Sequence, residues 1–431
     1  MYATIYDAFK DLFGVKIPFL KLLQSFGFFV AIAFLLCAWV FAKELNRKQK
    51  LGLFPNFVPR ILKYMKGMRM STNDLVTNFI FAALIGYKFT DLVVGTAVAE
   101  ADPRAYMLSG KGNILGALVI GFLWTAIRYA YLEKKKLPQP LEIEEKEKAG
   151  DHVGNMTLIA AGFGFLGAKI FHILENWHDF MADPKGMFFS FSGLTMYGGL
   201  IVGGIAVLVY SHRKKLDLLN VMDACAPGLL LAYGVGRLGC HISGDGDWGV
   251  VNTAPKPHWM GFLPNWTWAY DYPNNVNNTI NPYTDTASAA YKAVPMQGFV
   301  QSLSGQDPHL VAPVFPTPFY EASIMILLFI VFWRIRKRFT SPGLMFSTYM
   351  IANGVERFFI ELIRVNTTMF KIGTHRVTQA EFIASLLMIF GAIGVWWTKK
   401  RAKNLPPPTP PAEEPPKETP VNSEPAPEPT A

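Results

Sequence analysis

The residues best suited to chemistry stand together between positions 233 and 249, in the sequence YGVGRLGCHISGDGDWG. Arg237 and His241 end an apolar stretch, and Asp245 and Asp247 follow directly. Because a charge is costly inside a bilayer, ionisable residues at the end of an apolar helix usually mark a functional site. The intervening glycines allow a sharp turn and the close approach of a ligand. The pattern therefore predicts a site of chemistry here.

A second charged group lies nearer the C-terminus. Arg357, Glu361 and Arg364 are spaced i, i+4 and i+7, which places them on one face of a helix. Arg237 and Arg357 then place guanidinium groups from two different helices at the same depth in the membrane. A guanidinium offers a planar fork of donors that matches phosphate oxygens. We therefore expect a phosphate-bearing lipid of the outer leaflet as the ligand.

Other polar or small residues open two further apolar segments. These are Glu321, which ends the sequence FPTPFYE, and Tyr197 with Gly198 and Gly199. The expected topology places all of them in the outer half of the membrane. The alternative is that the arginines and glutamates only pair with each other and stabilise the helix bundle.

Metal and nucleotide chemistry are not predicted. Asp245 and Asp247 could bind a divalent cation, but two carboxylates without further ligands are a weak signal. They fit better as groups that orient Arg237 or position a nucleophile. His241 alone is more typical of a structural histidine than of a base. Neither a nucleotide phosphate loop nor a dinucleotide fingerprint occurs, so we expect no cofactor.

The segments that carry these residues are long and apolar. Of the 431 residues, 51% are hydrophobic, and runs of about 20 apolar residues recur, each long enough to cross a bilayer. This predicts an all-α polytopic membrane protein with about nine transmembrane helices. The expected spans are 19–42, 75–97, 113–132, 153–176, 195–211, 218–240, 317–334, 343–363 and 377–398.

Charge fixes the expected orientation. Lysines and arginines cluster in alternate loops, whereas the loops around 98–112, 177–194, 241–316 and 364–376 hold few for their length. Cytoplasmic loops carry the positive excess, so the N-terminus is expected outside and the C-terminus in the cytoplasm. The net charge of +9 is therefore a membrane signal, and no nucleic-acid partner is predicted.

The three cysteines, Cys37, Cys225 and Cys240, lie in or at the end of apolar segments. A disulfide framework or a zinc site is therefore not expected. Cys240, close to Arg237, could be a reactive thiol, but a small buried hydrophobe is the more usual role.

The chain divides into seven expected parts. Residues 1–18 read as an amphipathic arm on the membrane surface rather than a cleavable signal, and the residues after 398 are rich in Pro and Glu and are expected to be disordered. The parts are the arm 1–18, a first transmembrane helix 19–46, an inserted cytoplasmic segment 47–152 with two extra helices, a transmembrane core 153–240, a periplasmic cap 241–316, a second core part 317–398, and a disordered cytoplasmic tail 399–431.

Four sequence blocks resemble one known family. The block GRLGCHISGDGDWG at 236–249 is similar to the membrane signature of the prolipoprotein diacylglyceryl transferases. Three others agree with that family in order and spacing: FMADP followed by YGGL, PTPFYE, and GVERFFIELIR. The resemblance covers roughly 19–46 and 153–398.

The resemblance implies a function and its residues. Members of the family move the diacylglyceryl group of phosphatidylglycerol to the lipobox cysteine of prolipoproteins in the bacterial cytoplasmic (inner) membrane, forming a thioether and releasing glycerol phosphate. By resemblance, Arg237 and Arg357 would hold the lipid phosphate, and Glu361 and Arg364 would shape the exit. The other expected lipid-binding residues are Glu321, Gly198, Gly199 and Gly249.

The chain departs from the family pattern at the expected base. The family usually has a histidine before Gly-Gly-Leu, where this chain has Tyr197, and a phenol is the weaker base at neutral pH. Phe26 stands where a tyrosine is usual, and an asparagine and a glutamate of the signature become Cys240 and an aspartate pair. The catalytic candidates are therefore Tyr197, His241, Asp245, Asp247 and Arg357, with the base left open among the first three.

Two other functions fit the same pattern. One is a non-catalytic protein that binds or moves phospholipid and has lost the base. The other is a related transferase that acts on another lipid or acceptor. A group near Arg237 that can activate a nucleophile would distinguish the first of these from an enzyme.

Overall fold

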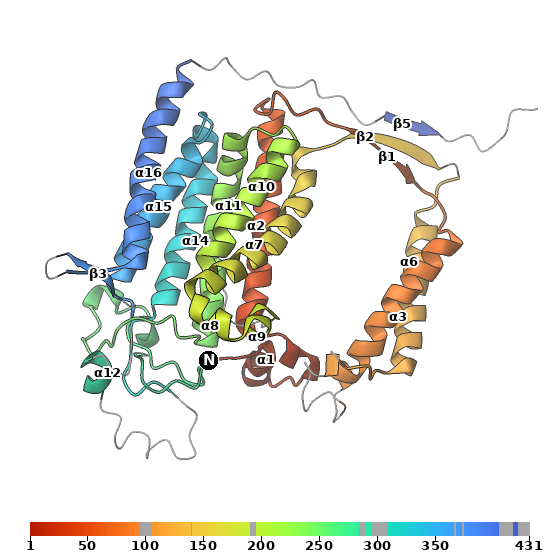
Figure 1. The fold of residues 1–431 in the computed structure, drawn as a ribbon. Helices are drawn as coiled ribbons and strands as arrows, with labels where there is room; N and C mark the ends of the chain where they lie inside the picture. Colours follow the sequence, from red (N-terminus) through yellow and green to blue (C-terminus); the bar gives the residue numbers. More distant parts are fainter. Residues whose placement is uncertain are drawn as a thin grey trace, which may run out of the picture.

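The structure is a computed structural model of the whole chain. It describes residues 1–94, 96, 106–107, 109–138, 140–189, 195–283, 289–294, 309–365, 368–372, 375–404 and 417–420. The fold is helical with a few short strands, and most helices stand side by side in one bundle (Figure 1).

Long helices occupy each of the nine segments that the sequence predicts as spans. They are α2 (Ser25–Lys50), α3 (Thr72–Val94), α6 (Ile114–Lys134), α7 (Val153–Glu175), α10 (Met196–Arg213), α11 (Leu218–Ser243), α14 (Thr317–Ile335), α15 (Leu344–Glu361) and α16 (Gln379–Ala402). Within the described residues, seven helical stretches are long and apolar enough to cross a membrane, and α10 and α15 are not among them. Both are only 18 residues long, and α15 carries Glu356, Arg357 and Glu361. The structure therefore supports a multi-pass membrane protein, with seven candidate spans among the described residues where the sequence predicted nine.

Helix α11 lies at the centre of the bundle. Of its most apolar stretch, 56% is buried in the protein, against 28% or less for the other candidate spans. Its glycines meet neighbours closely: a Cβ on Gly228 would lie 3.1 Å from the Cys37 carbonyl oxygen of α2, and one on Gly234 would lie 3.1 Å from the Ala322 carbonyl oxygen of α14. Small residues at such contacts let membrane helices approach backbone to backbone. This packing holds Arg237 between α2 and α14.

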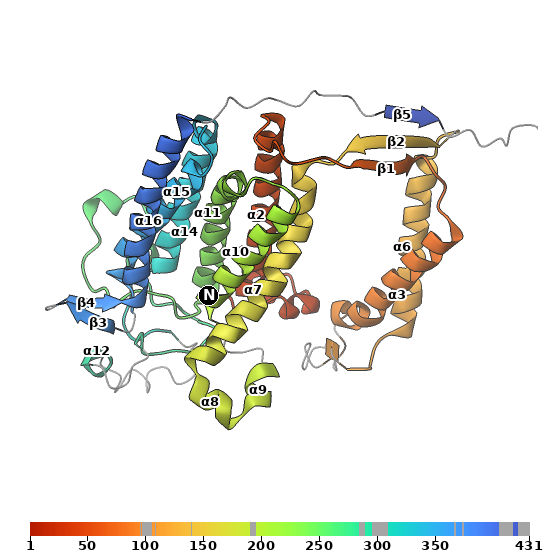
Figure 2. The same cartoon turned by 45° about the horizontal axis from the view of Figure 1, so that its top comes forward.

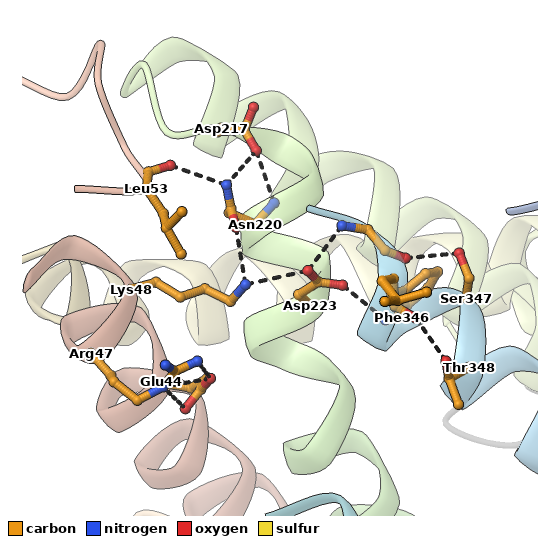
Figure 3. Close-up of polar contacts among 12 residues, drawn as sticks. Glu44, Arg47, Lys48, Leu53, Asp217, Asn220, Asp223, Phe346, Ser347 and Thr348 are labelled. Atoms are coloured by element: carbon orange, nitrogen blue, oxygen red, sulfur yellow. Dashed lines mark hydrogen bonds and ion pairs between the residues drawn. The ribbon is translucent and has the colours of Figure 1, made fainter. Parts of the chain in front are cut away.

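A buried polar cluster ties α11 to α2 and α15 at the end of the bundle away from Arg237 (Figure 3). Lys48 Nζ donates to Asn220 Oδ1 at 3.0 Å and pairs with Asp223 Oδ2 at 3.2 Å. Asp223 also accepts from the backbone N–H groups of Gly343 and Phe346, both at 2.9 Å. Lys48 and Asp223 are almost fully buried, so each charge depends on the other. The cluster fixes the relative position of the helices that carry Arg237 and Arg357.

Helices α3 and α6 form an antiparallel hairpin that stands apart from the bundle (Figures 1 and 2). The two helices pack through Gly86, Gly116 and Gly121. A ribbon of β1 (Ile61–Lys66) and β2 (Leu141–Lys146) joins the hairpin to the rest, and β5 (Lys417–Pro420) pairs with the other edge of β2.

Strand β5 differs from the prediction of a disordered tail. Its four residues pair through backbone hydrogen bonds, which need no apolar side chains. The remaining residues of the tail after Asn404, 405–416 and 421–431, lie outside the described residues.

The N-terminal arm forms α1 (Ile5–Phe13) and the short helix η1 (Pro18–Leu22). Thr4 and Asp7 form a capping box that starts α1. Leu12 and Phe13 are exposed, so the helix presents an apolar face outward, as expected of an arm that lies on a membrane surface. The Met1 amino group donates to the Pro273 carbonyl oxygen at 2.7 Å, which attaches the arm to the cap.

Beyond the C-terminal end of α11, the described parts of 241–316 form a cap. The cap has its own small core of Trp248, Tyr272, Leu310 and Val314. It contains the short helices η3 (His258–Met260), η4 (Asn265–Thr267) and α12 (Ala289–Ala293). The remaining short elements of the fold are η2 (Ala149–His152), α8 (Trp177–Ala182), α9 (Pro184–Phe189), η5 (Arg336–Arg338), β3 (Thr368–Ile372) and β4 (His375–Thr378).

Candidate active site

The site is built around Glu321, near the start of α14. Glu321 is fully buried. Its Oε2 lies 2.7 Å from Arg237 Nε and accepts a hydrogen bond of 2.6 Å from the Tyr233 hydroxyl. Arg237 also pairs with Asp247, which follows the end of α11. The two ends of the 233–249 sequence therefore meet at one guanidinium.

Two more guanidiniums reach the same carboxylate, from Arg357 of α15 and from Arg364. Helix α15 ends at Glu361, so Arg364 lies beyond it, in an isolated bridge with Gly249, and not on the helix face that its i+7 spacing predicted. Arg357 Nη1 lies 3.5 Å from Glu321 Oε2, and Arg364 Nη1 lies 3.6 Å from Glu321 Oε1. Arg357 also pairs with Glu361 one turn along the helix, at 3.0 Å, as the i, i+4 spacing predicts. Arg237, Arg357 and Arg364 thus converge, and we call these three residues the arginine cluster.

The arginine cluster has donors to spare. Arg357 Nη1 and Arg364 Nε are buried and have no hydrogen-bond partner, although both side chains make ion pairs through other atoms or at longer range. An unsatisfied buried donor is costly unless a ligand satisfies it. The sequence left open that the arginines only pair with glutamates. Such ion pairs are present, but they do not use all of the arginine N–H donors. The spare donors suit the oxygen atoms of an anion.

The two aspartates have opposite electrostatic surroundings. Burial and the nearby charge of Asp247 raise the pKa of Asp245 above its ordinary value. Burial acts in the same direction on Asp247, but the charges of Arg237 and Arg364 outweigh it and lower its pKa. Asp247 Oδ1 accepts from Arg364 Nη2 at 2.7 Å. Asp247 is therefore an anionic partner of the cluster, whereas Asp245 is the carboxyl able to take up a proton.

Cys240 joins the aspartates in a group of three possible metal ligands. One atom of each of Cys240, Asp245 and Asp247 lies within 4.8 Å of the others. The Asp247 oxygens already bind two guanidiniums, however, and a cation would have to displace them. The group suits a proton-handling role better, because the Cys240 thiol lies close to the Asp245 carboxyl, whose pKa is raised by burial.

His241 points into a box of aromatic rings. Its ring centroid lies 5.4 to 5.9 Å from those of Trp266, Tyr270, Tyr272 and Phe319. Its Nδ1 lies 3.2 Å from the Tyr272 hydroxyl. These contacts are those of a packed structural histidine, which is the alternative that the sequence left open.

The residues that open α10 pack against α7. A Cβ on Gly198 would lie 2.5 Å from the Gly167 carbonyl oxygen, and one on Gly199 would lie 3.0 Å from that of Gly164. Both glycines therefore let α10 and α7 approach closely, and their expected role in lipid binding stays a prediction. Among the described residues, no hydrogen bond or ion pair joins Tyr197 to the arginine cluster.

Gly249 holds the end of α15 in place. It forms an isolated bridge with Arg364, and its N–H donates to the Phe315 carbonyl oxygen at 2.8 Å. A Cβ here would lie only 2.6 Å from the Ile363 carbonyl oxygen. The glycine therefore acts on the site through the position of Arg364.

Sequence reasoning did not single out two residues of this region. Tyr233 donates to Glu321, and its place one turn before Arg237 was the available signal. Glu356 lies beside Arg357, is 5% exposed, and has no hydrogen-bond partner for either carboxyl oxygen. The signal for Glu356 was a third charge within one apolar segment.

Known proteins resemble this chain over more than half of its length. A protein from Corynebacterium glutamicum named phosphatidylglycerol–prolipoprotein diacylglyceryl transferase is 28% identical over 255 residues, which are 58% of this chain and 70% of that protein. Proteins of the same name from Leptospira interrogans and Streptococcus uberis are 23% identical over 317 residues and 26% identical over 279 residues. These alignments cover 62% and 64% of this chain, and 86% and 87% of the two relatives.

A family model described as prolipoprotein diacylglyceryl transferase matches residues 114–398. The expected resemblance covered 19–46 and 153–398; the match instead begins at α6, does not include 19–46, and contains every residue of the arginine cluster. It covers more than half of the chain. The chain belongs to the prolipoprotein diacylglyceryl transferase family.

Proposed function

We propose that this protein transfers the diacylglyceryl group of phosphatidylglycerol to a cysteine thiol of prolipoproteins. The family and the names of the relatives support the reaction. The observation in the structure that carries the proposal is the pair of unpartnered buried donors, Arg357 Nη1 and Arg364 Nε, beside Arg237. Three guanidiniums in a buried site are suited to a phosphodiester whose charge must be held while a bond to it breaks.

The reaction replaces a carbon–oxygen bond by a carbon–sulfur bond. The lipobox sulfur attacks the glyceryl carbon that bears the phosphate, the C–O bond breaks, and glycerol phosphate leaves with the electron pair. The thiol proton must pass to an acceptor, because the thiolate is the nucleophile. In a site shielded from water, fixed cations stabilise the leaving phosphate more strongly than they would in solution. The arginine cluster supplies this function.

Asp245 is the proposed proton acceptor. Its carboxyl lies within 4.8 Å of one thiol, that of Cys240, and burial raises its pKa, which suits it to take up a proton. Asp247 holds Arg237 and Arg364, and His241 is enclosed by aromatic rings. Within the part of the chain that the structure describes, Tyr197 has no hydrogen bond or ion pair with the arginine cluster, which favours Asp245.

The proposed topology has nine spans, with the N-terminus and the 241–316 cap on the periplasmic side of the bacterial inner membrane. It places the β1–β2 ribbon and the C-terminal tail in the cytoplasm. The arginine cluster then faces the outer leaflet, where the lipid and the signal peptide of an exported prolipoprotein meet. Both substrates are held in the membrane plane, which limits the orientations they must search before reaction.

The test uses the purified full chain in phosphatidylglycerol vesicles with a peptide that contains a lipobox cysteine. We expect the peptide mass to increase by one diacylglyceryl group. Arg237→Ala should abolish the increase, whereas Arg213→Ala, on an exposed residue at the other end of the bundle, should not. An unmodified peptide, with lipid still bound by folded wild-type protein, would favour a lipid-binding or lipid-moving protein instead.

A further inference from the structure

A groove of about 530 Å³ lies between α14 and α15, next to the arginine cluster. Its lining is apolar except for one carboxyl group. The residues that define it are Ile324, Leu328, Ala352, Phe359, Ile360 and Glu356. Phe359 is 64% exposed and Ile324 is 38% exposed, so the groove opens toward the surroundings of the bundle. In the proposed topology those surroundings are lipid.

Glu356 is the exception in this groove and also in the site. Asp247, Glu321 and Glu361 each lie within 3.0 Å of a guanidinium nitrogen. Glu356 is buried like Glu321 and Glu361, but neither of its oxygens has a hydrogen-bond partner. A buried polar group without a partner costs free energy, and such groups are rare in native proteins. An unpartnered carboxyl that lines a cavity therefore indicates a ligand that supplies the partner.

The position of Glu356 restricts what part of a ligand it can meet. It neighbours Arg357 in α15, and Leu328 and Ala352 line the groove beside it. A carboxyl repels phosphate, which the arginine cluster attracts. A glycerolipid with its phosphate at the cluster and one acyl chain in the groove would carry the ester of that chain past Glu356. A neutral carboxyl has an O–H donor, and an ester carbonyl is an acceptor.

We propose that Glu356 and the α14–α15 groove form a subsite for one ester-linked acyl chain of the lipid substrate, with the neutral Glu356 carboxyl donating to the ester carbonyl oxygen. The inference rests on the proposed function for the identity of the lipid. It assigns to Glu356 the recognition of the diacylglyceryl group, separate from the recognition of phosphate by the arginine cluster.

The test compares two probes that differ only in the carbonyl. Phosphatidylglycerol with ester-linked chains and its ether-linked analogue have the same headgroup and chain length. Binding of each lipid to the full chain in detergent is measured without peptide, so that no turnover is needed. Wild-type protein should bind the diester about fivefold more tightly than the diether, the size of one neutral hydrogen bond.

Three variants complete the design. Glu356→Gln keeps an N–H donor of similar size and should retain the preference for the diester. Glu356→Leu removes the donor and should bind both lipids equally. Ala352→Phe fills the groove and should weaken binding of both lipids alike. The inference is wrong if Glu356→Leu keeps the full preference, or if wild-type protein shows none.

The binding readout separates this inference from the proposed function. If the ester preference follows Glu356 but the peptide gains no mass, the subsite stands and the transferase proposal fails. If transfer proceeds and the ester preference does not depend on Glu356, the subsite is wrong and the transferase stands. Because leucine replaces a buried carboxyl that has no partner, Glu356→Leu should fold, and Glu356→Gln tests the donor independently.

Discussion

At the scale of single residues, the chemistry depends on three arginines that share one buried glutamate. Glu321 neutralises part of their charge and holds them in a fixed arrangement, while Arg357 Nη1 and Arg364 Nε remain available. A preorganised set of donors stabilises developing charge without rearrangement during the reaction. We therefore expect the guanidinium group, and not only its charge, to be required.

Arg357→Lys should therefore reduce transfer to the peptide by about 100-fold or more, the usual cost of removing one aligned donor. Lysine keeps the charge but lacks the planar fork. The measurement is the initial rate of peptide modification at saturating lipid. Arg213→Lys, at an exposed position, serves as the control and should keep the wild-type rate. A rate for Arg357→Lys close to that of wild-type protein would show that charge alone is sufficient.

The role of Asp245 predicts a dependence on pH. Burial and the charge of Asp247 raise its pKa, so the ionised form that accepts a proton appears at higher pH than for an ordinary aspartate. The transfer rate should rise as the pH increases through this raised pKa, and it should fall below it. Asp245→Asn should be slow at every pH and should lose this rise. The pH profile of the rate, measured for both proteins, checks the assignment; an unchanged profile in the variant would exclude it.

The sequence contained much of this site. The helical spacing of Arg357 and Glu361 and the position of Arg237 in the last turns of α11 sufficed to predict that guanidiniums converge; Arg364 joins them from beyond the end of α15. The sequence did not show that Asp245 and Asp247 differ in role. That difference depends on which aspartate reaches the arginine cluster after the turn at Gly244 and Gly246. Nor did the sequence show that Gly198 contacts Gly167, because the partner of a glycine is a matter of helix packing.

At the scale of elements, α11 and α15 must be held in register for the arginines to meet. The buried contacts of Lys48, Asn220 and Asp223 do this at one end, and the bridge between Gly249 and Arg364 does it at the other. The positions of the helices followed from apolar runs in the sequence. The sequence did not show which helices are neighbours, because an apolar run predicts a helix but not the helix that packs against it.

The polar cluster predicts a specific pattern of stability. Lys48→Met should lower the free energy of unfolding by about 3–5 kcal/mol, because it leaves the Asp223 charge buried without its partner. Adding Asp223→Leu should restore part of this loss, since the uncompensated charge is then removed as well. Thermal unfolding in detergent, followed by circular dichroism, measures both. If the double variant is less stable than Lys48→Met alone, Asp223 contributes chiefly through its bonds to Gly343 and Phe346.

Gly249 offers a test of how the end of α15 is positioned. Gly249→Ala places a Cβ 2.6 Å from the Ile363 carbonyl oxygen, so the backbone beside Arg364 must shift. We expect a loss of transfer activity of about tenfold or more, since displacements of about 1 Å already disturb catalytic geometry. Gly204→Ala, in α10, is the matched control, because a Cβ there meets nothing within 4 Å. Equal rates for the two variants would show that Gly249 has no positioning role.

At the scale of the whole molecule, the hairpin of α3 and α6 is the part with the least obvious purpose. Seven helical stretches qualify as candidate spans by length and composition, and α3 and α6 are among them. The proposed topology of nine spans adds α10 and α15, and it requires the hairpin to cross and return. This topology rests on the charge pattern of the loops, in which lysines and arginines cluster in alternate loops.

Cysteine labelling in intact cells tests this topology. Lys111→Cys, at the turn between α3 and α6, should react with a membrane-impermeant thiol reagent, because that turn is expected outside. Lys63→Cys, on exposed strand β1, should react only after the membrane is opened. The wild-type chain, whose three cysteines are not exposed, gives the background. The opposite labelling pattern would invert the proposed orientation.

The most direct test of the account is the stoichiometry of the two products. Glycerol phosphate and modified peptide are quantified together in one reaction of wild-type protein with phosphatidylglycerol and lipobox peptide. If the arginine cluster holds the phosphate while the thiol attacks, the two products appear in equal amounts, and Arg357→Lys reduces both by the same factor. Release of glycerol phosphate without modified peptide would contradict the account, because the site would then cleave the lipid without transferring it.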